Sequence, residues 1–476
     1  MKHALILSLL LSGCVYGRGR QTEEPFDLDA ELSRGGEQGA ASPPTNARDD
    51  DPAWWTGFGV SELDALETRA AQSAPDLRTA EARVMRANAL ATQASAARYP
   101  TVSLNGSLSV GRSNSPVGGS IDSRSANVSL PIAWEVDLFA RRANAAASAR
   151  RSASASEADA DGIALVLQAQ VVEAYFDLVD VRSQRRLLEE DREADAHTSE
   201  LVLLRFSRGL ATAVDVEQAR QQEIADDAQL SLLTSAETSA RLRLATLLGM
   251  PPSTLPELTG SALPPPPADL GAQVHADLLA ERPDLRAARS RVSAADHAVG
   301  SAIASRLPSI QLSFTPGYSS VRSESSFGNS TSTGISYTAA ASLSAPLFDG
   351  FAGRGRVDEQ RANLMEAEAG YERALLGALV EVEATLALER DERAHHEALM
   401  RSVEVAERLV AAAQDRFRLG LSDFLPVLGA LRSRTLARLA LLASERRLLS
   451  LRVTLHRAVG GPLPHSAPPP SPEQEP

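Results

Sequence analysis

The chain has 476 residues, enough for two average domains or for one long repetitive architecture. Asp and Glu number 61 against 48 Lys and Arg, and the formal charge of −13 makes nucleic acid or another polyanion a poor candidate partner. Aromatic residues make up only 4%, and the abundance of Ala, Leu, Arg, Glu and Ser is typical of long helices rather than of an aromatic-rich β-domain.

The N-terminal residues have the pattern of an export signal. A basic residue precedes an apolar run over residues 4–11, which is too short to span a bilayer as a helix but suits a signal peptide. The run leads to Leu-Ser-Gly-Cys at residues 11–14, which resembles the bacterial lipobox, and Cys14 is the only cysteine. We expect residues 1–13 to be removed and Cys14 to be acylated; the alternative is an incidental thiol. Val15 stands where an Asp commonly retains lipoproteins in the inner membrane.

The chain after the predicted signal has no apolar stretch long enough for a membrane-spanning helix. One lipidated terminus is a weak to moderate anchor, so other membrane-embedded structure is expected. No stretch after the signal reaches roughly 18 consecutive apolar residues, so any crossing must be made by β-strands closed into a barrel. With a single cysteine, disulfides and cysteine-based zinc sites are excluded.

The chain contains a tandem duplication. Pro-Asp-Leu-Arg at residues 75–78 recurs at residues 283–286, and Arg-Phe-x-x-Gly-Leu at residues 205–210 recurs at residues 416–421. Order, spacing and residue type are kept over a span too long for chance. The predicted organisation is a lipoprotein signal peptide (1–13), an acylated linker (14–53), a first repeat (54–249), a Pro-rich linker (250–269), a second repeat (270–460) and a disordered Pro-rich tail (461–476).

Each repeat is predicted to begin with a helix followed by strands. The helices, about residues 60–98 and 270–306, end at Tyr-Pro and Leu-Pro pairs because the residue before proline resists the α region. In residues 101–111 the even positions are mostly apolar and the odd ones are polar or Gly, and residues 127–138 repeat the pattern. The corresponding apolar positions of the second repeat are Ile310, Leu312, Phe314, Tyr337, Leu343 and Leu347.

This alternation predicts two membrane β-hairpins, and therefore four strands. Period-two alternation over ~10 residues suits a transmembrane strand, and the Gly-, Ser- and Asn-rich residues 112–123 and 319–334 are predicted as loops. A soluble hairpin packed on a helical core would share the pattern. The scarcity of charge on the polar face and the export signal favour the membrane.

Very long helices are predicted after each hairpin. Residues 140–206 and 354–417 contain no proline, and some 65 helical residues would reach ~100 Å. Apolar residues recur there with the 3.5-residue period of a coiled-coil seam. Gly209 and Gly420 provide helix stops, and a return helix of roughly 35 residues should follow each.

The predicted fold class is mixed and internally duplicated, and it requires an oligomer. Four strands cannot close a barrel, and open strand edges in lipid would leave backbone amides unsatisfied at several kcal/mol each. Protomers must therefore share one composite transmembrane β-barrel, with four strands from each. Long antiparallel helices that leave the strand ends must continue it as a coiled-coil barrel, and a tube of this kind is a conduit.

Several motifs resemble one family over nearly the whole chain after the signal. Trp54-Trp55 near the mature start, Trp-Glu-Val-Asp-Leu-Phe at residues 134–139 and Pro-Leu-Phe-Asp-Gly at residues 346–350 resemble the NodT-type outer-membrane efflux lipoproteins, relatives of TolC. The resemblance implies a homotrimer with a twelve-stranded barrel in the outer membrane. Its periplasmic tunnel would dock an adaptor and an inner-membrane pump, as the passive exit duct of a tripartite efflux system.

The narrowest point of such a tunnel is expected where the long helices turn back, farthest from the barrel. Many relatives carry Leu-Leu-Asp-Ala-Gln-Arg after the second turn, and its Asp helps to form a ring at the closed tip. Here residues 427–432 are Val-Leu-Gly-Ala-Leu-Arg, so Gly429 stands at the acidic position and leucines with inter-helix Arg contacts should form the seal. The candidate constriction residues are Asp215, Glu217, Asp423, Leu425, Leu428 and Arg432. The charged members have the alternative of being ordinary solvated helix residues.

No catalytic residues, metal ligands or cofactor motif are predicted, and the chain is not expected to be an enzyme. The adjacent His395 and His396 point some 100° apart on a helix, and the acidic residues 189–191 and 226–227 are expected to face water. The alternative function is a periplasmic coiled-coil adaptor or scaffold lipoprotein without a pore. It would explain the lipobox and the heptads but not two alternating hairpins at equivalent places.

Overall fold

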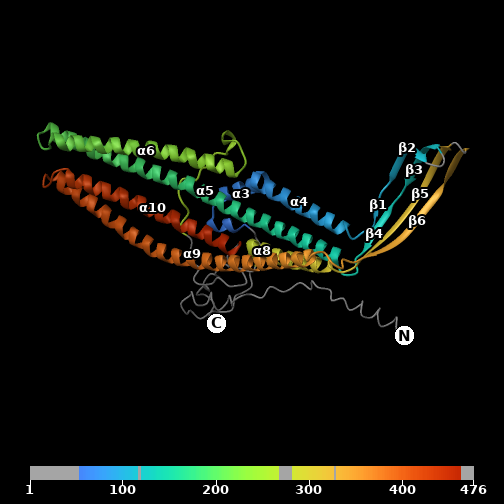
Figure 1. The fold of residues 1–476 in the computed structure, drawn as a ribbon. Helices are drawn as coiled ribbons and strands as arrows, with labels where there is room; N and C mark the ends of the chain where they lie inside the picture. Colours follow the sequence, from blue (N-terminus) through green and yellow to red (C-terminus); the bar gives the residue numbers. More distant parts are fainter. Residues whose placement is uncertain (1–52, 116–118, 267–280, 326–327, 462–476) are drawn as a thin grey trace, which may run out of the picture. The chain divides into compact units, whose positions relative to one another are not determined.

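The computed structural model describes residues 53–115, 119–266, 281–325 and 328–461 (Figure 1). These residues divide into two compact units. The strand unit comprises residues 82–158 and the described part of 286–373, and the helical unit comprises the other described residues. The long helices pass from one unit into the other, so both units are built from both repeats. The predicted signal peptide, Cys14 and most of the C-terminal tail lie outside the described residues.

The helix lengths repeat the duplication. Helices α5 (Arg141–Ser207) and α9 (Ala352–Arg418) have 67 residues each, and α6 (Ala213–Leu247) and α10 (Leu425–Val459) have 35 each. The prediction of two long helices with shorter return helices is confirmed. Among the described helices, α5 alone is long and apolar enough over one window to cross a membrane. Half of that window is buried inside the protein, as in the core helix of a folded domain.

The first predicted helix is interrupted, so the prediction of one helix over residues 60–98 is wrong. A short 3₁₀ turn, η1 (Trp54–Phe58), precedes α3 (Ser61–Ser73), and α4 (Pro75–Ala96) starts after a break. The break lies at Ala74, which is extended (ψ 128°) because it precedes a proline. In the second repeat, α8 spans Pro283–Ala304, and most of its predicted N-terminal extension lies outside the described residues. A second 3₁₀ turn, η2 (Pro252–Thr254), lies in the Pro-rich linker.

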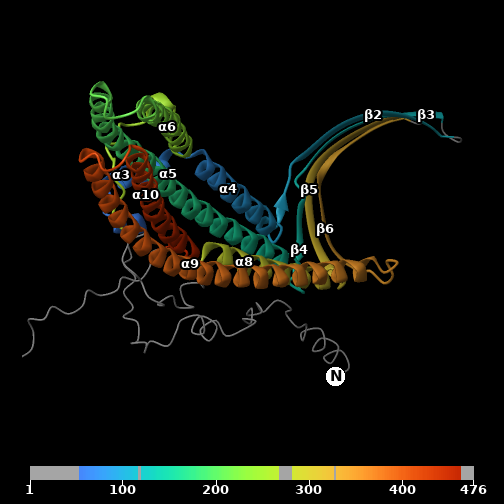
Figure 2. The ribbon, with the colours of Figure 1, turned by 90° about the vertical axis from the view of Figure 1, so that its left-hand side faces the viewer.

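The strand unit contains one antiparallel sheet. Its strands are β1 (Thr101–Val102), β2 (Asn105–Ser115), β3 (Gly119–Ser129), β4 (Ile132–Val136), β5 (Ser309–Ser325) and β6 (Gly328–Ser344). Strands β1 and β2 form one interrupted run and β3 and β4 another, so four runs lie side by side, with β5 between β3/β4 and β6. The strands bend together along their length (Figure 2).

The prediction of loops at residues 112–123 and 319–334 is wrong. Most of these residues continue the strands, with Arg112 paired to Asp122 and Ser320 to Thr333. The Gly, Ser and Asn content suggested turns, but backbone pairing with a neighbouring strand decides whether such residues are extended. Cross-strand contacts such as the 2.6 Å hydrogen bond between the Ser109 and Ser125 hydroxyls add to that pairing.

The strand register places the apolar positions of all four runs on one face of the sheet. Tyr318 lies opposite Val128 on one side and Ile335 on the other, and Leu312 lies between Trp134 and Ala341. The aligned apolar residues that form this face include Val102, Leu108, Val110, Val128, Ile132, Trp134, Val136, Ile310, Leu312, Phe314, Tyr318, Ile335, Tyr337 and Leu343. Many are strongly exposed, Leu108 by 87% and Ile335 by 84%. The opposite face carries mainly Ser, Thr, Asn and Gly.

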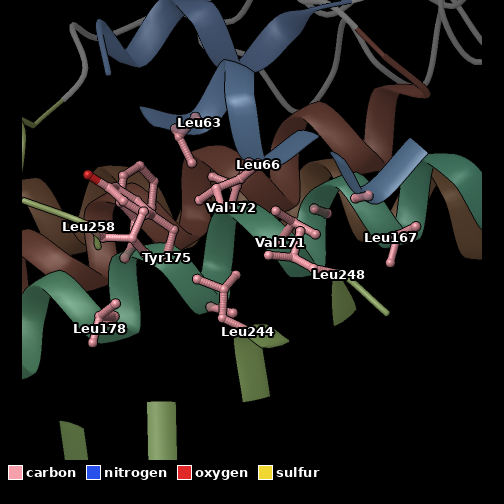
Figure 3. Packing of buried hydrophobic residues seen from close by; sticks show 14 of the residues in the cluster. Leu63, Leu66, Leu167, Val171, Val172, Tyr175, Leu178, Leu244, Leu248 and Leu258 are labelled. Atoms are coloured by element: carbon pink, nitrogen blue, oxygen red, sulfur yellow. The ribbon is translucent and has the colours of Figure 1, made fainter. Parts of the chain in front are cut away.

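The helical unit is held together by an apolar core around α3, α5, α6 and α10 (Figure 3). Leu63 and Leu66 of α3 point toward Val172 of α5, and all three are almost fully buried. Burying side chains of this size stabilises a fold by about 1.5–3 kcal/mol each. The linker is attached to the same core: Leu258 is buried in it, and Arg182 donates a 2.7 Å hydrogen bond to the Leu258 carbonyl.

Candidate functional site

The predicted constriction residues lie in, or within the first two helical turns after, the two connections that join the long helices to their return helices. Gly209 (φ 71°) and Gly420 (φ 75°) are left-handed, a conformation that glycine adopts without the steric cost of a Cβ. One residue later, Leu210 and Leu421 donate backbone hydrogen bonds of 2.8 and 2.9 Å to the carbonyls of Arg205 and Arg416. The repeated Arg-Phe-x-x-Gly-Leu sequence therefore encodes the same helix end twice.

Asp215 is engaged in capping its own helix. Its carboxylate accepts hydrogen bonds from the Thr212 backbone N–H at 2.7 Å and from the Thr212 hydroxyl at 2.8 Å, and the side chain is 8% exposed. The Asp215 N–H donates in return to the Thr212 hydroxyl, which completes a capping box. This carboxylate fixes the first turn of α6, while Glu217 on the same helix is exposed.

An apolar cluster, which we call the tip cluster, lies beneath the second turn. It comprises Val202, Ala219, Val410, Ala413, Phe417, Phe424, Val427, Leu428, Ala430 and Leu431. Leu428 is 4% exposed and belongs to this cluster, whereas Leu425, one turn earlier, is 57% exposed. Asp423 is also exposed. The two predicted leucines thus differ: Leu428 packs in the tip cluster, and Leu425 is exposed.

Two arginines connect the turn regions of the two repeats. Arg432 of α10 donates to the side-chain oxygens of Gln222 (2.8 Å) and Gln221 (2.9 Å) of α6. Arg205 at the end of α5 donates at 2.6 Å to the Phe417 carbonyl, and its guanidinium lies 4.6 Å from the Phe417 ring centroid. The inter-helix contact expected for Arg432 is therefore present. Arg205 was not among the predicted site residues, although its position in the repeated motif was a signal for it.

Gly429 is exposed, with no atom within 4 Å of the position a Cβ would occupy. Steric crowding therefore does not explain the glycine at this position. A carboxylate could be introduced here without displacing a neighbour.

The expectation that the two acidic stretches face water is wrong for Asp191. That side chain is 4% exposed and accepts hydrogen bonds from Arg434 (2.9 Å), Thr435 (2.5 Å) and Arg438 (3.3 Å), which joins α5 to α10. The sequence places Asp191 beside two other acids, but only the packing of three helices decides which one faces inward. Glu189 and Glu190 are exposed as expected.

A second buried carboxylate lies one helical turn farther along α5. Asp195 is 8% exposed, and burial, together with the nearby Asp226 carboxylate, raises its pKa to about 7. Its Oδ1 lies 4.0 Å from Arg434 Nη2 and accepts no hydrogen bond from the described residues. Burial also raises the pKa of Asp226, which accepts a 2.8 Å hydrogen bond from Gln222. Through Gln222, this acidic group is connected to Arg432 at the turn.

The described residues contain no group of three or more His, Cys, Asp or Glu side chains arranged to hold a metal ion. His395 is exposed and His396 is partly buried on α9. The site consists of two matched helix turns, the tip cluster and a polar network that links α5, α6 and α10.

Known proteins are similar to this chain in both sequence and fold. The family model described as outer membrane efflux protein matches twice, over residues 66–250 and 274–461. The pyoverdine export outer membrane protein OpmQ of Pseudomonas aeruginosa is 30% identical over 467 residues, which cover 95% of this chain and 96% of that protein. Nodulation protein T of Rhizobium leguminosarum bv. trifolii is 27% identical, with 95% of each covered. The solved outer-membrane channel OprN superposes with a TM-score of 0.82 at 28% identity, covering 94% of this chain and 99% of that chain.

Proposed function

The chain belongs to the outer membrane efflux protein family of TolC-like channels, and we infer that it is the outer-membrane channel subunit of a tripartite efflux system. It is a passive exit duct for small molecules and lies in the outer membrane with its helices in the periplasm. Its fold combines strands of a composite transmembrane β-barrel with a coiled-coil barrel of long helices. The family consists of channel proteins, and we propose that this chain has no enzymatic activity of its own.

One observation carries the channel function: the exposed apolar face that continues in register across all four strand runs. Such a face is stable only against lipid or another apolar surface. Within the described sheet, the outer edges of β2 and β6 pair with no other strand. We propose that three copies close these edges as a twelve-stranded homotrimeric barrel, because an open edge in lipid leaves backbone amides unsatisfied.

Conductance measurement tests the channel function against the alternative of a pore-free adaptor. Purified full-length protein in a planar lipid bilayer should produce discrete current steps. A protein that inserts or binds to vesicles without producing such steps would be a scaffold lipoprotein instead. The adaptor alternative gives no reason for the apolar face of the sheet.

We propose that the constriction is built by Asp215, Glu217, Asp423, Leu425, Leu428 and Arg432. In this proposal, Asp215 and Leu428 act by holding the turns, since both are buried, and the exposed Leu425 and Asp423 face the lumen. Arg432 holds α10 to α6 through two hydrogen bonds to neutral side chains. Exposed contacts of this kind are worth about 0.5–1.5 kcal/mol each, weak enough for a docking partner to break. The proposed partners are a periplasmic adaptor and an inner-membrane pump.

We also propose that residues 1–13 are cleaved and that Cys14 is acylated, so that the mature chain is attached to outer-membrane lipid. The linker 14–53 would then lead to the first repeat (54–249), and the Pro-rich linker 250–269 to the second (270–460), before the tail (461–476). Replacing Cys14→Ser should abolish incorporation of labelled palmitate. Unchanged labelling would contradict the lipobox assignment.

The relatives differ in the roles that their names state. OpmQ carries pyoverdine export in its name, and nodulation protein T carries a different role in its name at similar identity. Relatives with different named roles are therefore about equally similar to this chain. We propose only that this chain exports small molecules and that its pump selects them.

A further inference from the structure

A group of charged side chains lies at the end of the apolar face of the sheet. We call Arg112, Asp122, Arg124, Arg322 and Glu324 the rim cluster. Arg124 lies directly opposite Val110 on β2 and opposite Arg322 on β5, and Asp122 lies between Arg112 and Glu324 in the next row. All five therefore belong to the same face as Leu108 and Tyr318, at the point where that face stops being apolar.

The rim cluster lies at what we call the hairpin end of the sheet, where β2 leads to β3 and β5 leads to β6. Each strand run continues into or follows a helix at the other end: α4 precedes β1, and α9 follows β6. Since the helices are periplasmic, the hairpin end faces the outer leaflet. The strand from Ile310 to Arg322 measures about 40 Å at 3.4 Å per residue, or about 30 Å along the membrane normal at a tilt of about 40°. The depth is counted from Ile310, the first residue of β5 on the apolar face, which we place at the periplasmic boundary of the hydrocarbon core. Because that core is about 30 Å thick, Arg322 and the opposed Arg124 lie at the depth of the outer-leaflet headgroups.

The charges of the rim cluster are not balanced within the sheet. Arg112 binds Asp122 through two hydrogen bonds of 2.5 and 2.7 Å, and Arg322 lies 3.1 Å from Glu324. Arg124 is exposed and makes no hydrogen bond, and no ion pair within 4.0 Å, with the described residues, although its charge acts on the Asp122 carboxylate, which Arg112 already binds. Three arginines face two carboxylates, and two of the arginines, Arg124 and Arg322, are directly opposite each other. Like charges in this arrangement destabilise a sheet unless an anion lies between them.

We propose that Arg124 and Arg322 bind a phosphate group of the lipid A headgroup of lipopolysaccharide in the outer leaflet. Two guanidinium groups offer paired N–H donors that match phosphate oxygens. A phosphate there neutralises the opposed pair, while the acyl chains of the same lipid cover the apolar face next to it. The site would fix the depth of the barrel and surround it with tightly bound lipid. The proposal rests on the membrane placement of the sheet.

Lipid binding to the full-length protein in detergent tests the proposal. The probes are lipid A with both phosphates, the same lipid A after enzymatic removal of the phosphates, and inorganic phosphate. Wild-type protein should retain bisphosphorylated lipid A at least about tenfold more tightly than the dephosphorylated form, the change expected from one or more charge-assisted hydrogen bonds. Equal retention of the two lipids, or full competition by inorganic phosphate, would overturn it.

Variants locate the site. Arg124→Gln and Arg322→Gln should each weaken retention about tenfold. Arg354→Gln, which changes an exposed arginine on α9, should have no effect. Current steps in planar bilayers report separately whether each variant still forms a channel, so a failure of membrane insertion is distinguishable from a failure of the lipid site. If conducting Arg124→Gln channels retain lipid A as the wild type does, the assignment is wrong.

Discussion

The strand register leads to a direct test of which sheet face meets lipid. Phe314 and Ser313 are neighbours on β5, the strand that pairs on both sides, and they project to opposite faces. Phe314 lies between Ile132 and Ala339 on the apolar face. It is about 14 Å along the strand from Ile310, or about 10 Å into the membrane at a tilt of about 40°.

The replacement Phe314→Arg should prevent assembly, whereas Ser313→Arg should be tolerated. An arginine on the lipid face near the middle of the bilayer costs about 2–4 kcal/mol, and three copies in the proposed trimer bring this to about 6–12 kcal/mol. That is comparable to the whole stability of many proteins. On the opposite face the new charge meets water in the lumen, and it should alter conductance and ion selectivity with little effect on yield.

The assay measures the yield of oligomer in outer-membrane preparations by gel electrophoresis of samples that have not been heated, since heating dissociates the oligomer. The conductance of the purified channel is then measured. Phe314→Leu is the matched control, because it keeps an apolar side chain and should preserve most of the oligomer. Equal losses for Phe314→Arg and Ser313→Arg would refute the assignment of the faces. So would normal yield of Phe314→Arg.

Three further predictions concern the periplasmic helices. Arg432→Ala should remove the two hydrogen bonds to Gln221 and Gln222, about 0.5–1.5 kcal/mol each, and raise the open probability of single channels; an unchanged open probability would place the gate elsewhere. Gly429→Asp should leave thermal stability within about 1 kcal/mol of wild type, since nothing lies within 4 Å of the new Cβ, and should increase cation selectivity; a large loss of stability would contradict the open environment. Asp195 has a folded-state pKa of about 7 against an ordinary value near 3.8, so the folded state binds its proton more tightly and is favoured as pH falls from about 7 toward 4. As the pH falls from 8 to 5.5, this group should therefore add about 2 kcal/mol to the unfolding free energy of the wild type. Thermal melts of Asp195→Asn should lack that part of the pH dependence. The same pH dependence in the wild type and the variant would refute the assignment of this pKa to Asp195.

The buried acids mark where local sequence reasoning fails. Residues 189–191 are three consecutive acids, and no local rule tells which of them will be buried. Asp191 is buried because Arg434, Thr435 and Arg438, more than 240 positions later, present donors to it. Asp215 is a milder case: Thr-x-x-Asp is a capping pattern visible in the sequence, but its position in the turn suggested a lumen carboxylate.

The sequence by itself determined the duplication, the four strand runs and the long helices with their return helices. These depend on periodicity and on proline and glycine positions, which act over a few residues and need no distant partner. It also determined which strand residues share a face, because alternation is a local property. The tertiary structure decided where strands end, which acids are buried and which arginine meets which partner. Those outcomes depend on backbone pairing and side-chain packing between segments that are far apart in the chain. The neighbours that surround a residue in the fold are not specified by the residues next to it in the sequence.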